Sequence, residues 1–251
     1  MVTENKFMLA CRHERFSQGI KIAHISDLHK RRFGRNNRKL IKKIVSENPD
    51  IIFVTGDIVS RTQKNFDEVE NLFRRLAENS KVYFIFGNHE QDLPENLKEK
   101  LIEISSASGV RLLRNSIETV GINGRKINIA GVEPESTVYK KNGSYRNLDS
   151  FGINEIESLM GKCPEGKTFL LAHNPIFAYT YAEWGADYTF SGHIHGGAVR
   201  IFGRGIFSPE RKFFPKYSKG VYRVNRMKLC VSAGLGKLRL FNPPEIVFYE
   251  V

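Results

Sequence analysis

The sequence lacks any run of about 18 or more consecutive apolar residues, the length at which a transmembrane helix is expected. It also lacks the pattern of a secretory signal peptide, because Arg12, His13 and Arg15 interrupt the short apolar run near its beginning. We therefore expect a chain that neither crosses a membrane as a helix nor is exported by such a signal.

Cysteine is scarce. Cys11, Cys163 and Cys230 are odd in number and far apart, and no Cys-X-X-Cys pair occurs. This pattern argues against a disulfide-rich secreted scaffold and favours a reducing compartment. We expect a cytoplasmic protein.

Internal repeats, low-complexity tracts and linkers rich in Pro, Gly or Ser are absent as well. With 41% hydrophobic and 26% charged residues, the composition is that of a soluble globular protein. A length of 251 residues suits one large domain, so we expect a single domain over residues 1–251, with an N-terminal extension at residues 1–20.

Acidic residues are in deficit. The chain has 27 Asp and Glu against 39 Lys and Arg, which gives a formal net charge of +12. Much of the excess lies in residues 30–43 and 200–228. Such a chain attracts anionic partners such as phosphorylated metabolites, nucleic acid or acidic lipid headgroups, although a solvated basic surface explains the same composition.

Three short apolar segments, at residues 21–26, 50–56 and 81–87, predict β-strands that each end in polar residues. The two segments between them have apolar residues at helical spacing, from Leu40 to Val45 and from Phe66 to Leu76. Alternating strands and helices predict a largely parallel sheet with right-handed crossovers. Ligands of such sheets gather at the carboxyl ends of the strands.

The second half of the chain predicts a second sheet. After a helix expected over residues 96–106, short strands occur within residues 111–132, with a hairpin turn at residues 121–124. Further strands are expected at residues 167–173 and 188–193, which end in histidine, and as antiparallel strands at residues 220–234 and 245–251. The irregular segment at residues 195–220 is long enough to be a candidate active-site loop.

Polar residues of a few types close the predicted strands. In chain order the motifs are Asp27-Leu28-His29, Gly56-Asp57, Gly87-Asn88-His89, His173 and Gly192-His193-Ile194-His195. Residues two apart in extended backbone point to the same side, so the first and last motifs would each offer two ligands to one cavity. Glycine before a ligand residue would permit a sharp turn and close backbone approach.

Carboxylate, amide and imidazole ligands without thiolate suit Mn²⁺, Fe or Zn²⁺ better than they suit a structural zinc site. A single Asp or His at the end of a strand is more often a helix cap, a turn residue or a hydrogen-bonded polar group of the fold than a metal ligand. Together the donors, with one carboxylate able to bridge, favour two divalent metal ions ~3.5–4 Å apart that bind both oxygens of an in-line phosphoryl displacement.

The motifs, in this order, resemble those of the calcineurin-like metallophosphoesterase superfamily, from Lys21 to the C-terminus. The FGRNN sequence at residues 33–37 and the stretch from GHIHGG to FSPERKFFPKYSKGVY are similar to bacterial membrane-associated phosphodiesterases and to relatives that cleave UDP-diacylglucosamine. The resemblance implies an α+β fold, a four-layer αββα sandwich of two mixed β-sheets flanked by helices. The sequence departs from the pattern in two ways. Gly196-Gly197-Ala198 stands where Gly-Gly-Gln is frequent, and we expect no membrane anchor of the kind with which many relatives begin.

Carried over by position, the resemblance also implies ligands and a catalytic residue. One metal would be bound by Asp27, His29 and His195, the other by Asn88, His173 and His193, with Asp57 bridging and His89 catalytic. The histidine at this last position protonates the leaving oxygen or stabilises the phosphate in the transition state. Mn²⁺ is the metal we expect first, with Fe and Zn²⁺ as alternatives.

The expected function is that of a metal-dependent phosphodiesterase or pyrophosphatase, in which a hydroxide that bridges the metals attacks phosphorus. The substrate would be a phosphoester or phosphoanhydride, either lipid-linked or a nucleotide. A nuclease of the same superfamily is one alternative, although the sequence has no nucleic-acid recognition module. A non-catalytic scaffold of the same fold is another, although loss of metal ligands would be expected there.

Aromatic and basic residues are interleaved within residues 200–219, which would allow peripheral contact with an anionic membrane at its inner face. Packing of the aromatic residues against the second sheet, with solvated charges, explains the same pattern. Nothing in the sequence indicates an obligate protein partner.

Overall fold

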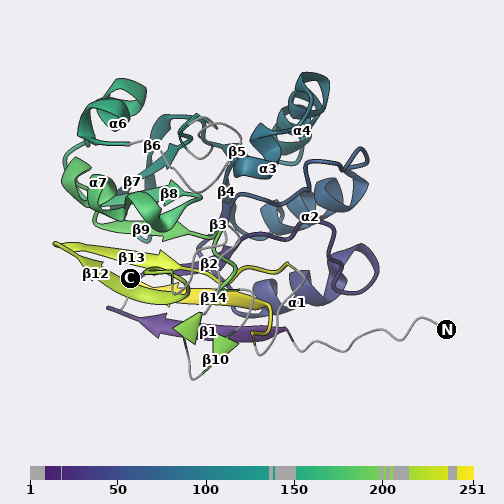
Figure 1. The fold of residues 1–251 in the computed structure, drawn as a ribbon. Coiled ribbons are helices and arrows are strands. Elements are labelled where there is room, and N and C mark those ends of the chain that lie inside the picture. Colours follow the sequence, from purple (N-terminus) through teal and green to yellow (C-terminus); the bar gives the residue numbers. More distant parts are fainter. Residues whose placement is uncertain are drawn as a thin grey trace.

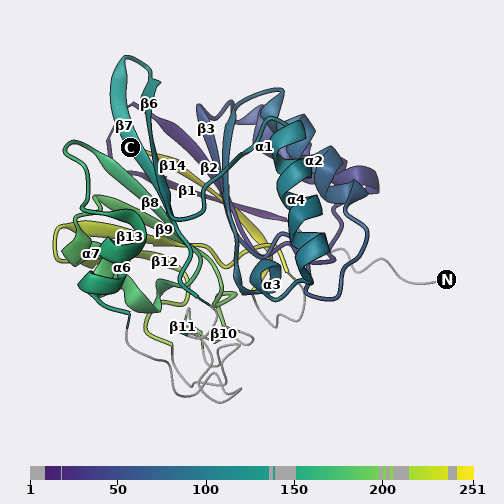
Figure 2. The same ribbon diagram turned by 90° about the horizontal axis from the view of Figure 1, so that it is seen from above.

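Two six-stranded β-sheets lie face to face, and helices cover the outer face of each (Figure 1 and Figure 2). The structure is a computed structural model that describes residues 9–17, 19–135, 138, 151–197, 200–201, 204–205, 215–236 and 242–251. Both sheets contain parallel and antiparallel strand pairs. The expected α+β sandwich of four layers is confirmed.

The first sheet has the strand order β1-β14-β2-β3-β4-β5. Its strands are β1 (Ala10–Arg15), β2 (Lys21–Ile25), β3 (Ile51–Thr55), β4 (Lys81–Ile85), β5 (Arg111–Leu112) and β14 (Glu245–Glu250). Strands β2 to β5 are parallel, whereas β14 is antiparallel to β2 and parallel to β1. The three apolar segments of the N-terminal half therefore form the centre of this sheet, as expected.

Helices α1 (Arg38–Ser46), α2 (Asp67–Ala77) and α4 (Glu95–Ala107) cover the outer face of the first sheet, as Figure 2 shows. The short helices η1 (Arg35–Asn37) and α3 (Asn88–Gln91) precede α1 and α4. Leu40 and Ile44 of α1 are buried, as are Val69 and Leu76 of α2. The predicted helical faces are thus the faces that pack on the sheet.

The second sheet has the order β12-β13-β9-β8-β7-β6. Its strands are β6 (Ser116–Ile122), β7 (Arg125–Val132), β8 (Thr168–Ala172), β9 (Tyr188–Ser191), β12 (Gly220–Val224) and β13 (Met227–Val231). Helices α6 (Ile153–Met160), η2 (Pro175–Phe177) and α7 (Ala178–Trp184) belong to this half, and β10 (Arg200–Ile201) pairs with β11 (Arg204–Gly205). Asn123 and Gly124, both with positive φ, form the expected β6–β7 hairpin turn.

Aromatic side chains fill the space between the sheets. The Phe53 ring of β3 lies 4.8 Å from the Phe190 ring of β9 and 6.3 Å from the Phe169 ring of β8, measured between centroids. All three side chains are buried, and burial of each contributes about 1.5–3 kcal/mol. This core fixes the position of one sheet relative to the other, and hence of the strand ends that carry the predicted ligands.

Strand β1 was not expected from the sequence. Its residues, ACRHER, place four polar or charged side chains in succession, so the apolar pattern of a strand is missing. The strand forms because β14, more than 200 residues away in the chain, provides a parallel partner for all six residues. Within the part of the chain that the structure describes, none of the helices has the length and apolar character that a bilayer span requires.

Candidate metal centre

The predicted ligands lie directly after strands of both sheets. They follow β2 (Asp27, His29), β3 (Asp57), β4 (Asn88, His89), β8 (His173) and β9 (His193, His195). Because all five strands present their carboxyl ends on the same side of the sandwich, side chains from both sheets converge there.

The backbone at five of these positions is left-handed. Asp27, His29, Asp57, His193 and His195 have φ values between 52° and 68°, a region that residues other than glycine rarely occupy. The premise that the paired ligands lie in extended backbone is therefore wrong, although Asp27 and His29 do belong to one group of ligand-type side chains. The strands end before the motifs, and each left-handed residue costs about 1–3 kcal/mol, which is typical of functional sites where the fold imposes the conformation.

Glycine is required where the loops after β3 and β4 approach each other. A Cβ atom on Gly56, whose φ is 85°, would lie 2.6 Å from the Gly87 nitrogen and 2.8 Å from His173 Nδ1. A Cβ atom on Gly87 would clash with the Asp57 carboxylate. Any larger residue at either position would force these loops apart, so the expected close approach is confirmed at both.

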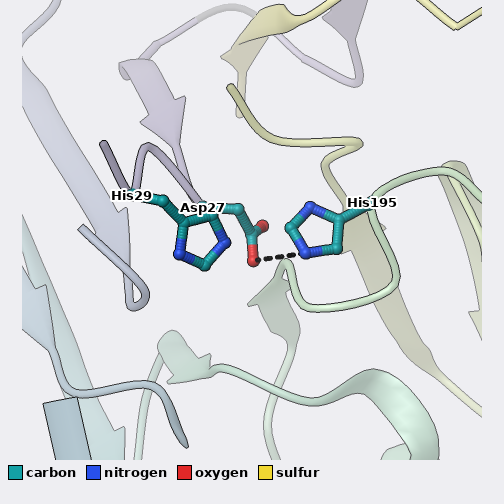
Figure 3. Close-up of side chains that lie close together, drawn as sticks. All are labelled: Asp27, His29 and His195. Atoms are coloured by element: carbon teal, nitrogen blue, oxygen red, sulfur yellow. Dashed lines mark ion pairs between the residues drawn. The ribbon is translucent and has the colours of Figure 1, made fainter. Parts of the chain in front are cut away.

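Asp27, His29 and His195 form the first group of ligand-type side chains, each with one ligand atom within 4.8 Å of the others. Figure 3 shows the Asp27 carboxylate between the two imidazole rings, with Oδ1 3.9 Å from His195 Nε2. The His193 N–H donates to the same carboxylate at 3.1 Å. Burial raises the pKa of Asp27, but the His195 imidazole and the other nearby imidazoles lower it by more. The net pKa is below its usual value, so the carboxylate is ionised at neutral pH.

Asp57, His173 and His193 form the second group. The His173 Nδ1–H donates to the Thr55 carbonyl oxygen at 2.7 Å. Because that oxygen only accepts, the neutral His173 ring has its lone pair on Nε2. This nitrogen lies 3.2 Å from Asn88 Oδ1, 3.2 Å from His193 Nδ1 and 3.4 Å from Asp57 Oδ2.

The acceptors of the second group favour a positive charge between them. The Asn88 and Asp57 oxygens and the His173 Nε2 lone pair all accept and would otherwise repel one another. Burial lowers the pKa of His173, but the Asp57 carboxylate outweighs it and raises the pKa to about 10. A proton satisfies one contact, whereas a divalent cation satisfies all three. Oxygen and imidazole donors without thiolate also fit divalent metals, so the residues fit the expected ions.

Asp57, a member of the second group, also faces the first group. Its Oδ2 is 3.4 Å from His173 Nε2, 3.9 Å from His89 Nε2 and 4.0 Å from His29 Nε2. Burial raises the pKa of Asp57, but the nearby His173 and the other imidazoles hold it well below its usual range. A buried anionic oxygen that faces imidazoles of both groups has the position of a bridging ligand.

His89 lies at the edge of the cluster, with 23% of its side chain exposed. Its Nδ1 accepts a hydrogen bond from the Arg61 backbone N–H at 3.3 Å, so the proton of the neutral ring is on Nε2, the nitrogen nearest Asp57. Burial lowers the pKa of His89 to about 4, so the ring is neutral at pH 7. A neutral imidazole with Nε2–H next to the cluster can donate a hydrogen bond to an anionic oxygen.

Glu90 holds two loops that carry ligand-type side chains, a role that the sequence did not predict. Its fully buried carboxylate accepts hydrogen bonds from the backbone N–H groups of Asp57 at 2.7 Å, Gly87 at 2.8 Å and Val59 at 2.9 Å. Burial, together with the Asp57 carboxylate, raises the pKa of Glu90 to about 8. The sequence signal that could have identified Glu90 is an acidic residue directly after Gly87-Asn88-His89. Only the fold shows that this residue joins two ligand-bearing loops.

The structure brings all eight predicted site residues into one cluster. Half of the candidate loop at residues 195–220 lies outside the described residues, as do the aromatic side chains on which membrane contact was predicted. That prediction therefore stays a prediction.

The chain is similar in sequence to one family of phosphoesterases and to several of its named relatives. Residues 20–197 match the family model described as calcineurin-like phosphoesterase. The chain is 26% identical to the metallophosphoesterase YkoQ of Bacillus subtilis over 249 residues, which covers 92% of this chain and 83% of YkoQ. It is 23% identical to the UDP-2,3-diacylglucosamine pyrophosphatase LpxG of Chlamydia muridarum over 278 residues, covering 91% of this chain and 82% of LpxG.

Solved structures show the same fold at low sequence identity. The protein TT1561 of Thermus thermophilus superposes with a TM-score of 0.53 at 12% identity, covering 86% of this chain and 89% of that one. The phosphopantetheinyl hydrolase PptH of Mycobacterium tuberculosis superposes with a TM-score of 0.51 at 16% identity, covering 86% and 88%.

Proposed function

The chain belongs to the calcineurin-like phosphoesterase family, a family of metal-dependent hydrolases, and we propose that it is a phosphodiesterase or pyrophosphatase that uses two divalent metal ions. The observation that carries the proposal is the position of Asp57 Oδ2, within 4.0 Å of imidazoles from both groups of ligand-type side chains.

The proposed ligand sets follow the two groups, with Asn88, whose Oδ1 lies 3.2 Å from His173 Nε2, added to the second. Asp27, His29 and His195 would hold one ion, Asn88, His173 and His193 the other, and Asp57 would contact both. Mn²⁺ is the ion we propose, because a mixture of carboxylate, amide and imidazole donors suits it and no thiolate is present to favour a softer metal. When bound, the two ions would stabilise charge on the phosphoryl oxygens and acidify the attacking water.

The residues of the chain orient these ligands. The Thr55 carbonyl oxygen fixes the His173 ring through Nδ1 and directs Nε2 to the cluster. Glu90 holds the backbone of Asp57 and Gly87. The ligand atoms are therefore placed before a metal or a substrate arrives, which reduces the reorganisation that binding requires.

His89 acts on the substrate as a hydrogen-bond donor in this proposal. Its Nε2–H is available because Nδ1 accepts from the Arg61 N–H, and its lowered pKa keeps the ring neutral at pH 7. A neutral donor beside the phosphoryl group stabilises negative charge that develops on oxygen in the transition state. Of the two roles expected for this residue, stabilisation of the phosphate is the one that the geometry supports.

The substrate class is supported by similarity alone. The LpxG proteins of two Chlamydia species are named UDP-2,3-diacylglucosamine pyrophosphatases, and they are 23% and 24% identical to this chain. This similarity supports a phosphoanhydride as an alternative to a phosphodiester substrate.

The test measures hydrolysis of bis(p-nitrophenyl) phosphate, beside p-nitrophenyl phosphate, by chelator-stripped protein before and after addition of Mn²⁺. We expect Mn²⁺-dependent diesterase activity that Asp57→Asn abolishes and His89→Ala lowers about 10²–10³-fold, the effect of losing one transition-state donor. His13→Ala is the matched control, because His13 is an exposed histidine of β1 outside the cluster.

Metal binding is measured on the same proteins by calorimetry. His89→Ala should bind Mn²⁺ as the unaltered chain does, whereas Asp57→Asn should bind it more weakly. Binding of Mn²⁺ without hydrolysis of either ester or of a nucleotide diphosphate ester would contradict the proposal and favour a scaffold of the same fold.

A further inference from the structure

A pocket of about 670 Å³ adjoins the candidate metal centre, with His29 in its wall. The loop after β2 and the loop between β3 and α2 form its sides. Its charged lining residues other than His29 are Lys30, Arg31, Arg32, Lys64 and Glu68, and we refer to it as the cationic pocket. Its volume is typical of sites for small ligands, which range over ~300–1,000 Å³.

Positive charge predominates in the cationic pocket even after its internal ion pair is counted. Arg32 pairs with Glu68, the single carboxylate among the described lining residues, at 3.4 Å. The lining therefore offers no second carboxylate to neutralise Lys30 and Lys64. The pocket has a positive potential next to the cluster where phosphate is proposed to bind.

Two of these cations are held in place by the fold. Lys30 Nζ donates to the Thr62 hydroxyl at 2.9 Å, across the two loops that form the pocket. Arg31 donates to the Gly236 carbonyl oxygen at 2.7 Å. Cations that are positioned before a ligand binds lose less side-chain entropy on binding it.

We propose that the cationic pocket binds a second phosphate group of the substrate, beside the phosphoryl group held at the metal centre. The inference rests on the proposed function, which places a phosphoryl group at that centre. A diester with a single negative charge would leave Lys30 and Lys64 without an anionic partner, whereas a diphosphate-linked substrate supplies one. The chain accordingly prefers substrates in which a further phosphate adjoins the scissile one.

The test compares binding of methylphosphonate and methylenediphosphonate to the Mn²⁺-loaded protein by calorimetry. The two probes differ by one phosphonate group, and the P–C–P bridge is not hydrolysed, so no turnover is needed. We expect methylenediphosphonate to bind at least tenfold more tightly, and the double variant Lys30→Gln and Lys64→Gln to lower this preference at least tenfold.

The matched control is the double variant Lys39→Gln and Lys42→Gln. Both lysines are exposed on α1 and neither lines the cationic pocket, so the control removes the same charge elsewhere. It should keep the preference for methylenediphosphonate. If the two double variants show the same preference as each other, the inference is overturned. Thermal melts show whether each variant is folded.

The outcome is separable from that of the proposed function. Absence of Mn²⁺-dependent hydrolysis of both bis(p-nitrophenyl) phosphate and a nucleotide diphosphate ester contradicts the proposed function, while the phosphonate comparison still decides what the cationic pocket binds. Hydrolysis together with unchanged phosphonate preference in the Lys30 and Lys64 variant contradicts the pocket inference alone.

Discussion

Replacement of Glu90 by Gln tests whether one buried carboxylate holds the two ligand-bearing loops of the first sheet. Its Oε2 accepts from the Asp57 and Gly87 N–H groups, and its Oε1 accepts from the Val59 N–H. Glutamine has nearly the same shape but only one acceptor oxygen. If that oxygen takes the Oε2 position, the amide NH₂ faces the Val59 N–H, and two donors meet in a buried site.

The expected cost follows from the hydrogen bonds lost. A hydrogen bond between neutral groups contributes about 0.5–1.5 kcal/mol, and an unsatisfied buried donor costs about 1–3 kcal/mol. These are two descriptions of the same lost contact, so we expect Glu90→Gln to lower the free energy of unfolding by about 1–3 kcal/mol. Burial and the Asp57 carboxylate raise the pKa of Glu90 to about 8, which disfavours the ionised form in the folded chain, so the comparison is made at pH 6.5, where the carboxyl group and the amide are both neutral.

The assay is urea denaturation followed by circular dichroism in the presence of chelator, with Mn²⁺ affinity measured separately at pH 7.5. Glu99→Gln on the exposed surface of α4 is the matched control, and we expect it to change stability by less than about 0.5 kcal/mol. Mn²⁺ affinity should fall about 10–100-fold in Glu90→Gln, as when partners that orient metal ligands are removed. A variant with unaltered stability and unaltered Mn²⁺ affinity would refute the reasoning.

Two further predictions concern the core. Burial lowers the pKa of His24 to about 3 from 6.5, so its stabilising effect is complete above pH 6.5 and is lost progressively as the pH falls toward 3. Between pH 7 and pH 5 the unaltered chain should lose about 2 kcal/mol more unfolding free energy than His24→Asn, measured by urea denaturation in chelator; equal losses would contradict the prediction. Phe53→Ala, which empties the centre of the inter-sheet core, should cost about 3–5 kcal/mol in the same assay. The exposed Tyr179→Ala is its control, and a similar effect of both substitutions would show that the sheets do not depend on this contact.

The sequence was sufficient to predict those strands that have an apolar pattern in their own residues. Strands β2, β3, β4, β8 and β9 were predicted because each is a continuous apolar run, as strands covered on both faces are. Strand β1 was not, because its pairing partner β14 is distant in the chain and its own residues are polar. Helices α6 and α7 were not predicted either, since they are short and follow segments without clear helical spacing.

The candidate site was predicted in its residues but not in its geometry. The order of ligand-type residues after apolar strands singled out eight side chains that the structure brings together, and their role as ligands stays a prediction. The left-handed backbone of Asp27 and Asp57 is imposed by the surrounding fold and has no sequence signal in residues other than glycine. The role of Glu90 depends on the distance between two loops, and that of the cationic pocket on the approach of residues 28–32 to residues 62–69.

The insertion of β14 between β1 and β2 has a consequence for synthesis on the ribosome. Strand β2, from which Asp27 follows, keeps one open edge until residues 245–250 have left the exit tunnel, because only β14 pairs with that edge. Among the strands that the structure describes, β1 pairs with β14, so it joins this sheet only after β14 is available. An unpaired edge of a partly formed sheet can pair with other chains, so a nascent chain that stalls before β14 should be a substrate for chaperones and prone to aggregate.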